Sequence, residues 1–175
     1  MKVGIDARKI GPYVNYVLKS LPKHNRHQFV LFFDSRISSE QAKKYQAKNV
    51  RSKRFPFSQY RKYLRQAYSQ ILVSAFLAKE RLDVFHATAG TMPLIYSGKS
   101  VLNIWQMERF KSKRSWQKKI CRKAKLIIVN SKELKNSLIK KYQVPEGKII
   151  VMKRPQANQI FNAYKKAKTS ARESK

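Results

Sequence analysis

The sequence predicts an α/β fold with a doubly wound, mostly parallel sheet of the Rossmann-like type, because apolar strand segments alternate with amphipathic helical segments. The clearest unit covers residues 124–152, which read AKLIIVNSKELKNSLIKKYQVPEGKIIVM. Its first apolar run, 126–129, shows no polar alternation, as is typical of a parallel strand that is covered on both faces. Asn130-Ser131 then offers a helix N-cap, and a second apolar run begins at Ile149. This order predicts one strand–helix–strand unit.

The other elements follow the same alternation and predict right-handed crossovers between strands. Strands are expected at residues 2–6, 28–34, 49–53, 83–86, 100–104, 125–130 and 148–152, and helices at 12–23, 38–47, 57–80, 114–123 and 132–142. Residues 163–175 are polar and basic, and such tails usually stay disordered unless a phosphate backbone holds them. The sequence therefore predicts a Rossmann-like domain at 1–155 and a basic C-terminal extension at 156–175, with a helix over 158–168 as an alternative for part of the extension.

Short motifs accompany these elements along the chain. Lys2–Arg8 form an opening strand that ends in Asp-Ala-Arg, and Gly11–Pro22 combine a short glycine loop with a first helix. Asp83–Ala87 read Asp-Val-Phe-His-Ala, and Gln143–Ile149 form a Val-Pro-Glu turn before the last strand. Taken in order, these motifs resemble the N-terminal, acceptor-side domain of family 4 glycosyltransferases with the GT-B architecture, over roughly residues 1–161. The order of the motifs carries the resemblance, and no single one does.

The sequence departs from that family at the strand after the proline loop. Where relatives carry Thr-Ile-His-Asp, this chain has Asn103-Ile104-Trp105-Gln106, so Trp105 and Gln106 replace the histidine and aspartate that the resemblance implies near the reaction centre. An indole cannot accept a proton, and an amide cannot orient an imidazole as a carboxylate does. The resemblance also implies a second Rossmann-like domain for the sugar nucleotide, and 175 residues hold only one. We therefore expect a glycosyltransferase-like chain that is inactive by itself.

Four residues fall at predicted strand ends or the loops after them, where open α/β sheets bind ligands. They are Asp6, Gly11, His86 and Thr88. His86 is either a site residue or a structural hydrogen-bond partner, and Asp6 is either a ligand contact or a cap or salt-bridge partner of Arg8. The sequence contains no Walker loop, no dinucleotide fingerprint and no metal-ligand cluster, so it predicts neither a cofactor nor a metal.

The composition fits one domain. With 42% hydrophobic residues, 175 residues are enough for a single core. Cys121 is the single cysteine, which excludes an intrachain disulfide and favours a reducing compartment. No apolar run reaches the ~18 residues of a spanning helix, and the sequence opens without a cleavable apolar leader. We expect a soluble, cytoplasmic protein, with a membrane surface or a ribonucleoprotein as its alternative locations.

The charge is the strongest compositional feature: 40 Lys and Arg against 9 Asp and Glu give a formal net charge of +31. Such an excess destabilises a compact chain by self-repulsion, and a polyanionic partner is the simplest explanation. The cations cluster in two segments that aromatic residues interrupt, and we expect these to form one continuous surface. The candidate polyanion-binding residues are Lys43, Lys44, Arg51, Lys53, Arg54, Arg61, Lys62, Arg65, Arg109, Lys111, Lys113, Arg114, Lys118, Lys119, Arg122 and Lys123.

Three interpretations of this charge stay open. RNA would release counterions as Lys and Arg neutralise its phosphates, an anionic membrane would attract the same side chains, and a solvated lysine surface needs no partner. Two function classes follow. In the first, the fold serves as a basic binding module for RNA in a ribonucleoprotein. In the second, the chain is the acceptor- or membrane-binding half of a split glycosyltransferase, and the donor domain lies on a second polypeptide.

Overall fold

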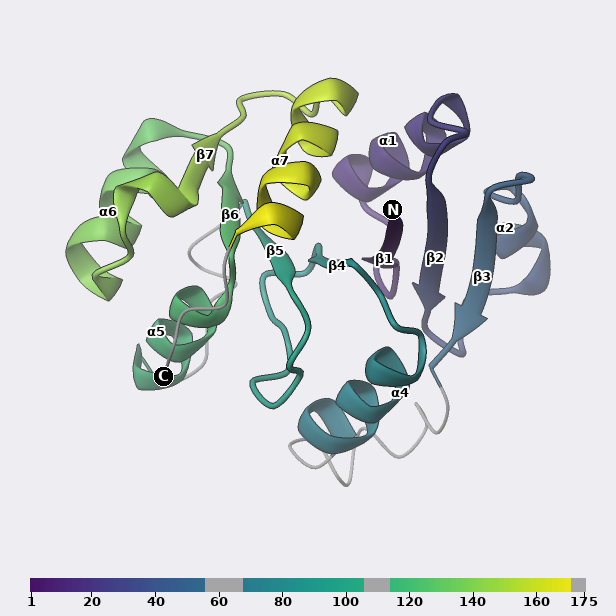
Figure 1. The fold of residues 1–175 in the computed structure, drawn as a ribbon, viewed down its shortest axis with the longest axis horizontal. Coiled ribbons are helices and arrows are strands. Elements are labelled where there is room, and N and C mark those ends of the chain that lie inside the picture. Colours follow the sequence, from purple (N-terminus) through teal and green to yellow (C-terminus); the bar gives the residue numbers. More distant parts are fainter. Residues whose placement is uncertain (56–67, 106–113, 171–175) are drawn as a thin grey trace.

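Seven parallel strands form a single sheet in the order β3-β2-β1-β4-β5-β6-β7 in a computed structural model that describes residues 1–55, 68–105 and 114–170 (Figure 1). The strands are β1 (Lys2–Asp6), β2 (Gln28–Phe33), β3 (Val50–Arg54), β4 (Val84–Ala87), β5 (Ser100–Ile104), β6 (Leu126–Val129) and β7 (Ile149–Val151). Every neighbouring pair is parallel. The predicted doubly wound Rossmann-like fold is confirmed.

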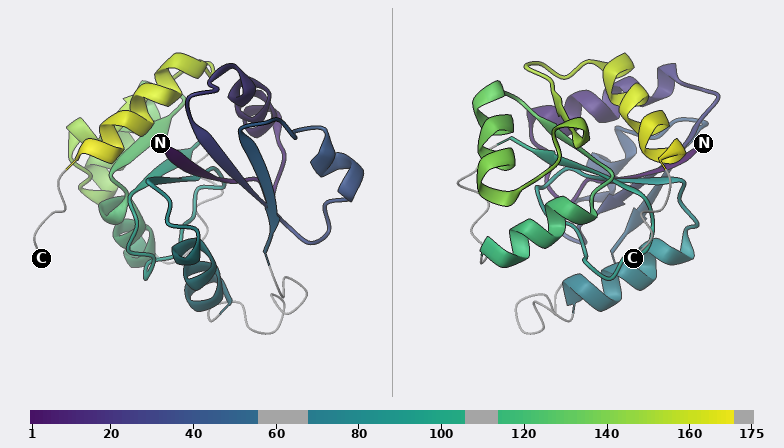
Figure 2. Two further views of the ribbon diagram at one scale, coloured as in Figure 1. Left: turned by 45° about the vertical axis from the view of Figure 1, so that its right-hand side comes forward. Right: turned by 60° about the vertical axis from the view of Figure 1, so that its left-hand side comes forward.

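Helices cover both faces of this sheet (Figure 2). They are α1 (Pro12–Ser20), α2 (Ser39–Lys43), α4 (Val73–Lys79), α5 (Arg114–Lys123), α6 (Lys132–Tyr142) and α7 (Ala157–Thr169). Short 3-10 turns at Leu21–Lys23 and Glu146–Lys148 and a π-helical turn at Tyr68–Leu72 complete the described helical structure. Buried side chains of α1, α2 and α7 pack on one face of the sheet, and those of α4, α5 and α6 pack on the other.

The predicted strand–helix–strand unit is present, with local capping at both ends of its helix. Ser131 Oγ accepts a hydrogen bond from the backbone N–H of Leu134 at 3.2 Å and so satisfies a free donor at the start of α6. Gln143, with φ of 55°, ends the helix in the left-handed conformation. All four residues of β6 are buried, as expected for a strand that is covered on both faces.

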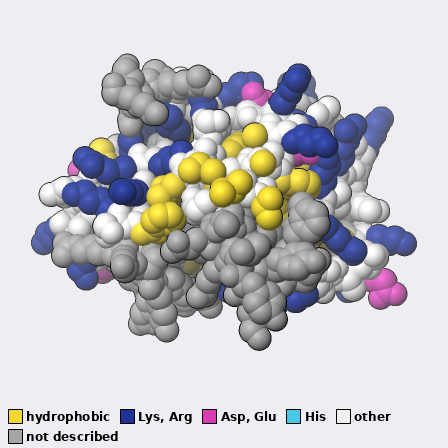
Figure 3. Space-filling view, turned by 90° about the horizontal axis from the view of Figure 1, so that it is seen from below, with side chains coloured by type: hydrophobic (Ala, Val, Ile, Leu, Met, Phe, Trp, Pro, Cys, Tyr) yellow, Lys and Arg dark blue, Asp and Glu magenta, His cyan; other side chains and the backbone are white. Residues whose placement is uncertain are grey.

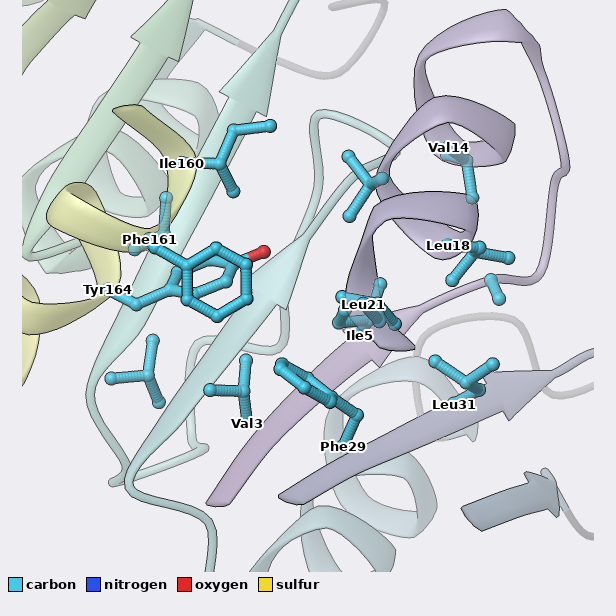
Figure 4. Packing of buried hydrophobic residues seen from close by; sticks show 14 of the residues in the cluster. Val3, Ile5, Val14, Leu18, Leu21, Phe29, Leu31, Ile160, Phe161 and Tyr164 are labelled. Carbon is cyan, nitrogen blue, oxygen red and sulfur yellow. The ribbon is translucent and has the colours of Figure 1, made fainter. Parts of the chain in front are cut away.

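Helix α7 belongs to the core, so the prediction of a polar tail from Ala163 is wrong for the described residues up to Ser170. Ile160, Phe161 and Tyr164 point from α7 toward the sheet, opposite Val14 and Leu18 of α1 (Figure 4). Its buried residues recur at helical spacing while its lysines occupy the other face. The average polarity of the segment hid this amphipathic pattern. The alternative, a helix over 158–168, matches the observed element.

Two other predicted helices are shorter than expected. The helix expected at 38–47 covers only Ser39–Lys43, and the one expected at 12–23 ends in a 3-10 turn. The described part of the helix predicted at 57–80 is the turn at Tyr68–Leu72 followed by α4, while residues 56–67 lie outside the described ranges. Across the described residues, none of the helices combines the length and the apolar character needed to cross a membrane.

The sheet interior provides a direct test of the fold. Ile128 is fully buried in the middle of β6, so Ile128→Asp places an unpaired carboxylate in the core and should lower the free energy of unfolding by several kcal/mol, roughly 3 or more. Asn136→Asp on the exposed side of α6 introduces the same charge and should change stability by less than ~0.5 kcal/mol. Urea unfolding followed by circular dichroism measures both, and a neutral Ile128→Asp would contradict the assignment of β6.

Candidate functional site

The structure brings Asp6, Thr88 and the start of α1 together at the carboxyl edge of the sheet. Thr88 Oγ1 donates to the backbone carbonyl of Asp6 at 2.5 Å, which links the ends of β1 and β4. The Asp6 carboxylate is fully buried and accepts twice from the Arg8 guanidinium, at 2.9 Å from Nε and 2.6 Å from Nη2, and once from the Arg8 backbone N–H at 3.1 Å. The Arg8 guanidinium also lies 5.1 Å from the centre of the Phe55 ring. Asp6 is therefore engaged as a salt-bridge partner, the second of its two interpretations.

His86 is held inside the protein by two tyrosines. Its Nδ1 lies 2.7 Å from the Tyr164 hydroxyl of α7, and its Nε2 lies 3.4 Å from the Tyr13 hydroxyl of α1. Burial lowers the pKa of His86 to about 3, although the nearby Asp6 charge opposes this shift. The imidazole is therefore neutral at physiological pH, and both of its nitrogens are occupied. This geometry favours the structural interpretation of His86.

The pKa values of both tyrosine hydroxyls are raised. Burial raises the pKa of Tyr13, and burial together with the neighbouring Tyr13 raises the pKa of Tyr164 well above its usual range. The cluster of Tyr13, His86 and Tyr164, here called the Tyr–His–Tyr cluster, is therefore uncharged. Sequence reasoning missed both tyrosines, because Tyr164 lies 78 residues from His86 in a segment interpreted as a tail.

Trp105 extends this cluster. Its ring centre lies 4.9 Å from that of Tyr13, and its backbone carbonyl accepts from Asn130 Nδ2 at 3.2 Å. The indole Nε1 is buried without a hydrogen-bond partner in the structure. Trp105 thus fills space beside Tyr13 with an aromatic ring that has no acid or base function. Gln106 lies outside the described residues.

Gly11 caps α1 without a side-chain hydrogen bond, and Pro12 occupies the first helical turn. An added Cβ at Gly11 would meet no atom within 4 Å, so packing does not require glycine there. Within the described ranges, no three His, Cys, Asp or Glu side chains gather in a way that could hold a metal ion. Burial raises the pKa of the Cys121 thiol to about 12, so it is not a reactive nucleophile.

Comparison with known families agrees with this architecture. The sequence model described as Glycosyltransferase Family 4 matches residues 10–155. The chain belongs to glycosyltransferase family 4. Among solved structures, it is similar to a glycosyltransferase from Rickettsia africae ESF-5, with 13% sequence identity and a TM-score of 0.57. That similarity covers 97% of this chain and 50% of the other, so the chain spans about half the length of that glycosyltransferase. No curated protein matches the chain.

This family member carries its predicted basic residues in two separate places. Four of them are exposed at one edge of the sheet: Lys43 on α2, Lys44 at its C-cap, and Arg51 and Arg54 on β3. Lys118, Lys119, Arg122 and Lys123 lie on α5, which packs on the other face through buried residues such as Ile120. Buried side chains of α2 pack on the α1 face and those of α5 pack on the other, and the continuous surface that we expected stays a prediction. The remaining candidates lie outside the residues that the structure describes: Arg61, Lys62, Arg65, Arg109, Lys111, Lys113 and the side chain of Arg114.

Lys53 differs from the other candidates because its ammonium is paired. It contacts the Glu80 carboxylate, which also lies 3.4 Å from Lys2 Nζ. Burial opposes ionisation of Glu80, but the hydrogen bonds from Lys53 and Lys2 outweigh it and lower the pKa of the carboxyl group. Lys53 thus links β3 to the end of α4 rather than contributing a free surface cation.

The buried histidine predicts a pH dependence of stability. The folded-state pKa of His86, about 3, lies below its unfolded value near 6.5, so the unfolded chain binds the extra proton and stability falls as the pH drops below about 6.5. Between about pH 7 and pH 5 this should remove about 2 kcal/mol. His86→Gln should lower the free energy of unfolding at both pH values, but it should abolish the loss between pH 7 and pH 5 that comes from His86. His24→Gln should keep that loss. Urea unfolding at the two pH values checks the difference, and an equal slope in His86→Gln and the wild type would contradict it.

Proposed function

We propose that this family 4 domain binds RNA through a basic surface on α5 and α6, and that the isolated chain transfers no sugar. The observation that supports the first part is the packing of two cation-rich helices side by side. Lys118 Nζ donates to Gln143 Oε1 at 2.5 Å, and the Tyr142 hydroxyl donates to Gln117 Oε1 at 2.5 Å. These bonds join the two helices into one surface, whose exposed cations include Lys119, Arg122 and Lys140.

We call this the α5–α6 surface, and define it by Lys118, Lys119, Arg122, Lys123, Lys140, Lys141 and Lys148. Lys148 Nζ donates to the backbone carbonyl of Arg122 at 3.3 Å, so the turn after α6 joins the end of α5. The nearby carboxylate of Glu146 already pairs with Lys135 at 2.6 Å. A surface of this kind attracts a phosphate backbone regardless of base sequence.

The acidic residues leave this positive charge largely uncompensated. Seven of the nine lie in the described ranges, and five of these form ion pairs: Asp6, Asp34, Glu80, Asp83 and Glu146. Asp6, Asp34 and Glu80 are also buried. The carboxylates therefore act mainly inside the fold, and the exterior keeps most of the net charge of +31. That excess favours a polyanion over a solvated surface of mixed charge.

The second part of the proposal rests on the carboxyl edge of the sheet. His86 is neutral and held by Tyr13 and Tyr164, Asp6 is paired with Arg8, and Trp105 packs on Tyr13. None of these side chains is available to accept a proton from an acceptor hydroxyl. The described edge therefore supports a structural role more than a catalytic one.

A specific observation supports a second candidate, docking on an anionic membrane. Ile71, Leu72 and Ile95 are 58%, 38% and 59% exposed, and Gln70 Oε1 accepts from the backbone N–H of Leu94 at 2.6 Å, which joins their two segments. Lys123 Nζ donates to the Leu94 carbonyl, so an α5 cation adjoins them. Hydrophobic side chains gather in a band on the face seen from below, with Lys and Arg to either side of it (Figure 3). Apolar residues flanked by cations suit an anionic bilayer.

RNA binding should depend steeply on salt and on the α5–α6 surface. If about six to ten phosphates are neutralised, affinity for an RNA hairpin should fall by roughly 10³ to 10⁵ between about 50 and 200 mM salt. Neutralising Lys119, Arg122 and Lys140 to Gln should reduce the slope of log K against log salt by about 2 to 3, because each lost phosphate contact removes ~0.7 to 0.9. Fluorescence anisotropy measures this slope.

The matched control removes three exposed cations from the opposite face, as Lys19→Gln, Lys23→Gln and Arg26→Gln, and should change the slope by less than about 1. Equal effects of the two triple variants would mean that attraction is diffuse. Tight binding to phosphatidylglycerol vesicles, lost in Ile71→Ser and Ile95→Ser, together with no RNA binding at physiological salt, would replace the RNA proposal with the membrane one.

Sugar transfer by the 175-residue chain alone should be undetectable. Incubated with a panel of nucleotide sugars and acceptors, it should release no nucleoside diphosphate above background, because the described edge holds no free general base. A complete family 4 enzyme assayed in parallel shows that the method detects turnover. Robust transfer by the isolated chain would refute this part of the proposal.

A further inference from the structure

A second basic feature lies where α2 stands beside the edge strand β3 (Figure 2). A groove of about 330 Å³ opens between these two elements. Its apolar lining is confined to Phe33 and Ala42, which are buried. The other lining residues are polar or cationic: Ser39, Lys43, Gln46, Ser52 and Arg54.

The two cations reach the groove from different elements. Lys43 belongs to α2 and Arg54 to β3, and both are exposed. Arg54 Nη2 donates to the Ile37 carbonyl at 3.1 Å and to Ser39 Oγ at 3.0 Å, which holds the guanidinium against the segment that leads into α2. A guanidinium carries five N–H donors, so these bonds, both made by one nitrogen, leave donors for a ligand. The groove thus has one cation that is positioned in advance.

The lining chemistry selects an anion with several oxygens. Two hydroxyls and one amide accompany the cations, and no carboxylate lines the groove. Glu40, the acidic residue of α2, is not among the lining residues. A lone carboxylate ligand would satisfy Arg54 alone, whereas the tetrahedral oxygens of a phosphate can accept from Arg54, Lys43 and the hydroxyls together.

We propose that the α2–β3 groove is a phosphate-binding site. The ligand is a phosphate group, carried by a small phosphorylated molecule or by the backbone of a nucleic acid. The volume exceeds that of a bare phosphate and lies at the lower end of small-molecule sites. This site is separate from the α5–α6 surface, because the sheet lies between the two, and it does not depend on RNA binding there.

The test uses the full chain and two probes, pyrophosphate and a short oligouridylate. In ¹⁵N-labelled wild type, both probes should shift the amide resonances of Ser39–Lys43 and Ser52–Arg54. The variant with Lys43→Gln and Arg54→Gln should bind pyrophosphate about tenfold or more weakly, because it loses two charged donors. The control with Lys44→Gln and Arg51→Gln removes the same charge nearby, outside the lining, and should lose less than about threefold.

Each outcome decides the proposal. Groove-specific shifts with both probes support a site open to free and polymeric phosphate, and shifts with the oligonucleotide alone support a site for a polymer backbone. Equal losses in the two double variants, or no amide shift in the groove with either probe, would overturn it. Should Arg54→Gln fail to fold, the wild-type amide shifts still give the answer. The Lys119, Arg122 and Lys140 triple variant should keep the groove shifts with pyrophosphate, which separates this site from the proposed RNA surface.

Discussion

The hydrogen bonds of His86 to two tyrosines organise one whole face of this protein. His86 lies on β4, at the centre of the sheet, and its two partners come from α1 and α7, which are the first and last helices of the described chain. Because all three side chains are buried and uncharged, neither helix can leave without exposing an unsatisfied polar group. The same bonds occupy the polar atoms that a catalytic edge would need free. The same hydrogen bonds thus stabilise this face and keep both nitrogens of the His86 imidazole engaged.

Electrostatics imposes the second constraint. With 40 cations and 9 acidic residues, a carboxylate can hold more than one basic group in place, as Glu80 does. Glu80 contacts Lys2 and Lys53 and so joins β1, β3 and the end of α4. Asp83 accepts from the backbone N–H of Lys2 at 2.7 Å and pairs with Lys168 of α7 at 3.1 Å. The few acidic residues therefore serve as internal links, and the surplus of positive charge is left outside.

The strands of the sheet could be predicted from the sequence, but the contacts of the candidate site residues could not. Strands such as β6 are continuous apolar runs, so local pattern predicts them directly. Helix α7 was missed as core because its lysines dominate its composition, although its apolar residues keep helical spacing. The two interpretations of His86 could not be separated, since the choice depends on a tyrosine 78 residues away. In the sequence, Lys53 has the same basic character as its neighbours Arg51 and Arg54. It differs from them in the structure because its ammonium pairs with Glu80, which lies 27 residues away.

The separation of the basic regions has a physical consequence for binding. The α5–α6 surface and the α2–β3 groove lie on opposite sides of a three-layer structure, in which each helical layer is about 10 Å thick. Charges separated by more than a Debye length, about 8 Å at physiological ionic strength, barely influence each other in water. An anion at one region therefore gains little from the cations of the other. If both regions bind anions as we propose, they act as independent sites, for separate ligands or for distant segments of one long polyanion.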